Sequence, residues 1–105
     1  MICLNHMTKG TVGNVKREEL LEKARICVCG EREQDYGTPE NNFGAIADLW
    51  SDYLKRQIDR RDVAAMMILL KVARISTSHC GGTDDTWVDI AGYAACGAEI
   101  GGECE

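Results

Sequence analysis

The sequence predicts an all-α fold, a compact four-helix domain, from three observations. Of the 105 residues, 45% are apolar, which is typical of one globular domain with one core. The chain contains one proline, so long stretches are free of the strongest helix breaker. Apolar residues recur at helical rather than alternating spacing. We expect the helical domain to span residues 15–101, after a flexible segment at 1–14 and before a tail at 102–105.

The first predicted helix covers residues 14–29 and ends at Gly30. Its apolar positions follow a spacing of three or four and form one stripe. The stripe consists of Leu20, Leu21, Ala24, Cys27 and Val28. Residues 31–37 have no helical period, and they predict a polar connection that contains one aromatic side chain, Tyr36.

The second predicted helix begins at Pro39, which follows an N-cap threonine and precedes an acid, the order typical of a helix start. It continues to about Lys55. Its apolar positions share one side of the helix and are Phe43, Ile46, Ala47, Trp50, Tyr53 and Leu54. Asp48 and Asp52 fall on the opposite side, so we expect both in solvent.

The third predicted helix starts after Asp59, with Asp62 three residues later as in a capping box. Residues 63–75 are apolar nearly all round, which predicts a central, buried helix. A fourth helix runs from Asp85 to about Ile100. Its packed face is expected to hold Trp87, Ala91, Ala94 and Ala98, with Asp85, Asp89, Gly92, Cys96 and Glu99 opposite and Tyr93 at the edge of that second face.

Charge and size limit the partners. A net charge of −5 disfavours long DNA or RNA, which is bound through a basic surface. The sequence contains neither a membrane-spanning apolar run nor the apolar stretch of a signal peptide, so we expect a cytoplasmic protein without a membrane partner.

A domain this small has a thin stability margin, and self-association is expected to cover the surfaces of Trp50, Met66 and Met67.

Six cysteines are expected to act as small apolar side chains or to lie in the chain ends. They form no C-x-x-C pair, and two of them are two residues apart in a helix, where side chains diverge. The six are Cys3, Cys27, Cys29, Cys80, Cys96 and Cys104. Neither a zinc site nor a disulfide is predicted.

Two polar pairs interrupt otherwise apolar helices and are the candidates for chemistry. Lys71 and Arg74 lie three residues apart in the third helix, and Asp85 and Asp89 lie four apart in the fourth. Two helices joined by a short link pack antiparallel, so the cations and the carboxylates are expected to lie close together.

Two interpretations of this constellation remain open. In the first, the four side chains form a salt-bridge network that fixes the register of two helices. In the second, Lys71 and Arg74 hold the phosphate of a nucleotide while Asp85 and Asp89 hold Mg²⁺. Arg32 and Tyr36 then approach from the connecting segment, and Tyr36 or Tyr93 stacks on the base, although a packing role is the more common one for a tyrosine.

Five motifs carry a resemblance to a known family. They are R-x-x-x-Y-G-x-P-x-x-N-F at residues 32–43, I-A-x-L-W-x-x-Y-L at 46–54, D-V-A-x-M-M at 62–67, K-V-A-R at 71–74 and D-x-W-x-D-I-A-G-Y at 85–93. Over residues 17–100 the chain resembles a family of small phage and prophage proteins. Such proteins are similar in outline to MazG-like all-α nucleotide pyrophosphohydrolases, which bind Mg²⁺ through acids on helices and cleave between the α and β phosphates.

The resemblance implies a phage-type nucleotide-binding protein in the cytoplasm of a host cell, either a MazG-like NTP pyrophosphohydrolase or a degenerate relative. The sequence departs from the enzymes because it lacks their E-E-x-x-E cluster and retains only Asp85 and Asp89 as a carboxylate pair. Two other functions therefore stay open. One is a non-catalytic anti-defence protein that sequesters a signalling nucleotide. The other is an inhibitor that binds a host protein through an acidic face made of Glu18, Glu19, Glu22, Asp48 and Asp52.

Overall fold

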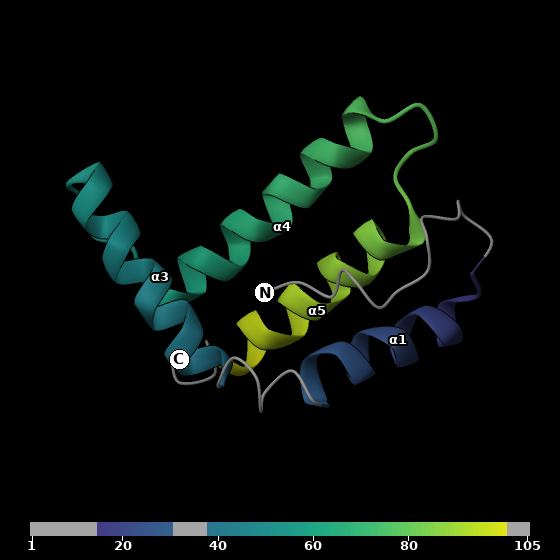
Figure 1. The fold of residues 1–105 in the computed structure, drawn as a ribbon, viewed down its shortest axis with the longest axis horizontal. Coiled ribbons are helices and arrows are strands. Elements are labelled where there is room, and N and C mark those ends of the chain that lie inside the picture. The colour runs from purple at the N-terminus through teal and green to yellow at the C-terminus, as the bar shows by residue number, and fades with distance from the viewer. Residues whose placement is uncertain (1–14, 31–37, 101–105) are drawn as a thin grey trace.

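The computed structural model of the protein describes residues 15–30 and 38–100 (Figure 1). These residues contain four α-helices and no strand. The helices are α1 (Arg17–Cys29), α3 (Pro39–Leu54), α4 (Arg60–Thr77) and α5 (Asp84–Ile100). The prediction of an all-α fold is confirmed, and each predicted helix is present within a few residues of its expected bounds.

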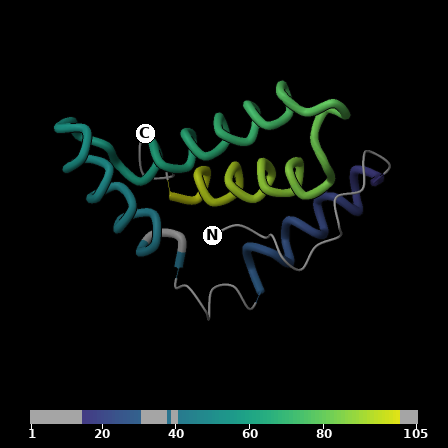
Figure 2. The backbone as a smooth tube through the Cα atoms, turned by 45° about the horizontal axis from the view of Figure 1, so that its top comes forward, coloured from purple at the N-terminus to yellow at the C-terminus, as the bar shows by residue number. Residues whose placement is uncertain are grey.

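The helix α5 is the centre of the arrangement. Figures 1 and 2 show it between α4 on one side and α1 on the other, while α3 crosses the start of α4. The prediction that residues 63–75 form the central, buried helix is therefore wrong. Among the described helices, α5 and α3 cover α4 along one side only, and Leu69 on its other side is 65% exposed. Apolar residues on every side of a helix therefore do not show that other helices pack against every side.

Local capping sets where α3 and α4 begin. The Thr38 hydroxyl accepts a hydrogen bond from the Asn41 N–H at 3.2 Å, directly before Pro39. Asp59 and Asp62 form a reciprocal capping box, in which each carboxylate accepts from the backbone N–H of the other residue, at 2.8 and 3.0 Å. Such caps satisfy N–H groups that have no partner within the helix, and both starts were predictable from the sequence.

The connections on either side of α4 are closed by serine hydroxyls. Ser51 Oγ accepts from the Ile58 N–H at 2.9 Å and donates to the Ile58 carbonyl at 3.1 Å, which ties the end of α3 to the residues before α4. After α4, Ser78 Oγ accepts from the Gly82 N–H at 3.0 Å. Gly81 and Gly82 both have positive φ, 80° and 98°, a conformation that favours glycine. This turn brings α5 back alongside α4.

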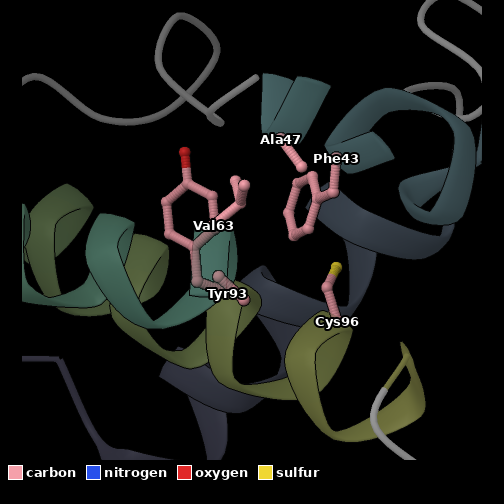
Figure 3. Close-up of a cluster of buried hydrophobic side chains, with 6 residues drawn as sticks. Phe43, Ala47, Val63, Tyr93 and Cys96 are labelled. Atoms are coloured by element: carbon pink, nitrogen blue, oxygen red, sulfur yellow. The ribbon is translucent and has the colours of Figure 1, made fainter. Parts of the chain in front are cut away.

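Two apolar clusters form the core. The larger joins α3, α4 and α5, and Figure 3 shows the Phe43 and Tyr93 rings beside Val63. Its buried members are Phe43, Ala47, Val63, Ala64, Tyr93 and Cys96. The smaller cluster joins α1 to α5 and contains Ala24, Cys27 and Val88. Each cluster includes residues of α5, which explains the central position of that helix.

The packed face of α5 is the reverse of the one predicted. Val88, Gly92 and Cys96 are buried, whereas Trp87 is 44% exposed. One reason is Gly92, which has no side chain. A Cβ added at Gly92 would lie 3.1 Å from Val28 Cγ1 of α1, and glycine permits that close approach.

The expectation for the cysteines holds only in part. Cys27 is disulfide-bonded, so the prediction that this chain has no disulfide is wrong. Spacing within one helix excludes bonds between neighbouring cysteines only, and it says nothing of partners distant in the sequence. Cys29 and Cys80 are exposed free thiols.

Replacing Gly97 with valine should separate α4 from α5. A Cβ at Gly97 would lie 3.0 Å from the Ala64 Cβ, so the larger side chain overpacks the core and lowers the free energy of unfolding by about 1–3 kcal/mol. Ala98→Val is the matched control, because Ala98 is exposed and its change costs only helix propensity. Urea denaturation measures both variants, and equal midpoints would show that the two helices do not pack closely at Gly97.

Candidate functional site

A buried ion pair joins α4 to α5. Lys71 Nζ lies 3.0 Å from Asp89 Oδ2, and each side chain is only 4% exposed. The pair forms because the two helices run antiparallel, so that the later turns of α4 lie beside the first turns of α5 (Figure 1). The expected proximity of these two residues is therefore present in the structure.

Burial makes this pair expensive to disturb. Moving a charge out of water costs several kcal/mol, and the attraction of a close partner of opposite sign offsets that cost. Removal of Lys71 or Asp89 leaves the other charge buried without this partner. For Lys71 and Asp89 the geometry is thus that of the structural alternative, an ion pair that fixes the register of two helices.

The other two members of the predicted constellation are placed differently. Arg74 is exposed, and within residues 15–30 and 38–100 it makes no ion pair with a carboxylate. Asp85 is half-buried one turn before Asp89 on α5. A single network of four charges therefore does not form. The Arg74 guanidinium is open to solvent, whereas Lys71 is paired with Asp89.

The aromatic candidates also separate. Tyr93 is 4% exposed, and its ring lies 6.1 Å from the Phe43 ring, centroid to centroid, so it is a side chain of the core (Figure 3). In this position it packs rather than stacks on a ligand. Arg32 and Tyr36, the remaining candidates, lie outside the described residues.

The predicted magnesium ligands are Asp85 and Asp89, and the donor set does not fit an open Mg²⁺ site. Mg²⁺ requires free carboxylate oxygens in near-octahedral geometry, whereas the Asp89 carboxylate already has the Lys71 ammonium at 3.0 Å. In the part of the chain that the structure describes, no group of three or more His, Cys, Asp or Glu side chains is placed to hold a metal.

Asp84, at the start of α5, is a residue that the sequence analysis did not single out. It is 5% exposed, and its Oδ1 has no hydrogen-bond partner among the described residues. The preceding Thr83 caps the helix, accepting from the Thr86 N–H at 3.3 Å. An acid in the first turn of a helix is favoured by the helix dipole. In the sequence, Asp84 therefore looks like an ordinary acid at a helix start, and nothing marks it as a functional residue.

The acidic face considered in the sequence is exposed. Its members on α1 and α3 all lie at the surface, and they are Glu18, Glu19, Glu22, Asp48 and Asp52. Arg25 Nη2 lies 2.7 Å from Glu22 Oε2, and this hydrogen bond from Arg25 lowers the pKa of Glu22.

A membrane crossing needs about 20 apolar residues, and no helix in the two described stretches combines the necessary length and apolarity.

Comparison with known proteins gives a family model and two phage relatives. Residues 19–101 match a domain of unknown function, DUF6378. The chain is similar to the "Gene 55 protein" of Mycobacterium phage D29, with 46% identity over 79 residues, covering 75% of this chain and 51% of that protein. The "Gene 55 protein" of Mycobacterium phage L5 is 48% identical over 77 residues, covering 71% of this chain and 47% of that protein.

The chain thus spans about half the length of these two curated relatives. No solved structure matches it. The match over residues 19–101 includes all five motifs singled out in the sequence. The two phage relatives confirm the expected resemblance to phage proteins.

Breaking the ion pair from one side should destabilise the protein. Lys71→Met leaves Asp89 buried without its cation and should cost about 3–5 kcal/mol in the free energy of unfolding. The double variant Lys71→Met with Asp89→Leu should recover most of that loss, because two apolar side chains of similar volume leave no charge buried. Thermal and urea unfolding of the single and double variants measure this. Additive losses would contradict direct pairing.

Proposed function

The chain belongs to the DUF6378 family and has relatives in two mycobacterial phages, and from that premise we propose that it is a phage nucleotide-binding protein that holds a phosphate-bearing ligand without hydrolysing it. One observation carries the proposal. The later turns of α4 offer an exposed cation, Arg74, that forms no ion pair with a described residue, while Asp89, one of the two predicted metal ligands, is engaged by Lys71.

Arg74 is the phosphate-binding residue in this proposal. A guanidinium presents donors in a planar fork that matches two phosphate oxygens. No described carboxylate competes for it. Lys71 lies one turn earlier on the same helix. Because it is paired with Asp89, Lys71 contributes only part of its positive charge to attracting the phosphate. Arg32 and Tyr36 remain the proposed contributors from the segment at 31–37.

Trp87 takes the stacking role that the sequence analysis gave to tyrosines. Its indole is 44% exposed and lies at the α4–α5 turn, since a Cβ at Gly82 would be 3.6 Å from Trp87 Nε1 and 3.0 Å from Ile75 Cγ1. Ile75 follows Arg74 directly in the sequence. A partly exposed indole and a guanidinium without a described carboxylate partner therefore occur at the same end of the α4–α5 pair, which suits a base and a phosphate.

Hydrolysis is the part of the MazG-like comparison that this geometry supports least. In-line attack on a phosphoanhydride relies on metal ions that neutralise charge at the attacking and leaving oxygens. The carboxylate pair that the sequence offers for this purpose has one member tied to a lysine. Sequestration of a signalling nucleotide, an anti-defence role, needs only affinity and is the use of such a site that we propose for a phage.

A second candidate function is inhibition of a host protein. It is favoured by one observation, the exposure of five acidic side chains on α1 and α3. Exposed acidic side chains would attract a basic partner, with association that weakens as salt increases. In that case nucleotides would not bind.

Arg74→Ala should abolish nucleotide binding and leave the fold intact. Because Arg74 is exposed and forms no ion pair with a described residue, its removal should change the free energy of unfolding by less than about 0.5 kcal/mol. Arg56→Ala is the matched control, since Arg56 is an exposed cation beyond the end of α3. Titration calorimetry of the three proteins against linear and cyclic nucleotides measures affinity. Equal affinities in wild type and Arg74→Ala would show that Arg74 is not part of the nucleotide site.

Incubation with nucleoside triphosphates and Mg²⁺ should release no pyrophosphate, and a bound nucleotide should be recovered intact after the complex is heated. Binding should also be the same with Mg²⁺ or with EDTA. Pyrophosphate release that EDTA stops and added metal restores would instead show that the protein is a pyrophosphohydrolase.

A further inference from the structure

The outer side of α4, facing away from α5, is an apolar stripe without a neighbour among the described residues. Its exposed large apolar members are Leu69, 65% exposed, and Val72, 45% exposed. On a helix with 3.6 residues per turn, seven positions share this side. They are Asp62, Ala65, Met66, Leu69, Val72, Ala73 and Ser76. Between its two polar ends the stripe contains no charge, which is unusual for a helix surface in water.

The order of side chains along this stripe is nearly the same in both directions. Leu69 stands at the middle, and the small residues Ala65 and Ala73 lie four positions to either side of it. Asp62 and Ser76 lie seven positions to either side. The spacing of three and four residues is that of a helix that packs against another along its length. A surface of this kind is complementary to a copy of itself turned end for end.

We propose that this α4 stripe, made of the seven residues from Asp62 to Ser76, docks against the same stripe of a second copy in antiparallel orientation. The two-fold axis passes at Leu69, so that Leu69 of each copy meets Leu69 of the other. The contact extends about 21 Å along the helix, at a rise of about 1.5 Å per residue.

The composition of the stripe supports this occupant over a different protein. Ala65 of one copy faces Ala73 of the other, and two small side chains allow the helix backbones to approach closely. The Asp62 carboxylate of one copy meets the Ser76 hydroxyl of the other, which can donate a hydrogen bond to it in place of its 3.0 Å bond to the Ala73 carbonyl. No charge is left without a polar counterpart, whereas a charged partner surface would lose its hydration against Leu69 and Val72.

The contact is independent of the nucleotide proposal, because Arg74 lies on the flank of α4 rather than on the stripe. Loss of nucleotide binding would not affect the dimer, and loss of the dimer would not remove Arg74 from solvent. The two proposals can therefore fail separately.

Opposite charges at Leu69 test the two-fold arrangement. The wild-type protein should sediment as a dimer at micromolar concentration. Leu69→Glu and Leu69→Lys should each be monomeric, with dimer dissociation constants raised more than about 100-fold, since each places two like charges in contact. An equimolar mixture of the two variants should again be dimeric, because Glu then meets Lys. Circular dichroism checks that each variant is folded.

Leu21→Glu is the matched control. Leu21 is 62% exposed, close to the exposure of Leu69, but it lies on α1, on the opposite side of α5. This variant should remain dimeric. A wild-type monomer at high micromolar concentration would overturn the proposal, including the case in which another segment of the same chain covers the stripe. A dimeric Leu69→Glu variant, or a mixture that stays monomeric, would also overturn it.

Discussion

The contact between Lys71 and Asp89 is the constraint on which the arrangement of α4 and α5 depends. With both side chains 4% exposed and 3.0 Å between Nζ and Oδ2, a shift of either helix by one residue would separate two buried charges. The pair thereby fixes which residues meet along the rest of the interface. The close approach of Gly97 to Ala64 and the position of Tyr93 beside Phe43 both require that register.

Much of the fold could be predicted because its signals are local. Thr38 with Pro39, and Asp59 with Asp62, mark helix starts through bonds within a few residues. The inner face of α5 could not be predicted in the same way. Alanine, glycine and cysteine differ little in hydropathy, so the face is decided by the room that Gly92 leaves for α1 rather than by an apolar stripe.

The candidate site shows the same division. Lys71 interrupts an apolar helix, and that interruption was enough to predict a partner in the next helix. The exposure of Arg74 and the burial of Tyr93 depend on how far each helix is rotated about its axis, and small errors in a projection at 100° per residue change both. Because Asp89 is neutralised by a side chain of the protein itself, a role in binding follows more readily from this geometry than a role in metal-assisted cleavage.

Nuclear magnetic resonance of the lysine ammonium groups tests this account most directly. In protein labelled with ¹⁵N, the Lys71 ammonium protons should exchange slowly with water at neutral pH and give a sharp signal. Exposed lysines such as Lys16 and Lys55 should lose theirs by fast exchange. Addition of Mg²⁺ should leave the Lys71 signal unchanged. Absence of the signal from the start would show that Lys71 is not buried against Asp89, and its disappearance on adding Mg²⁺ would show that Asp89 is available to a metal. Either result would contradict the account.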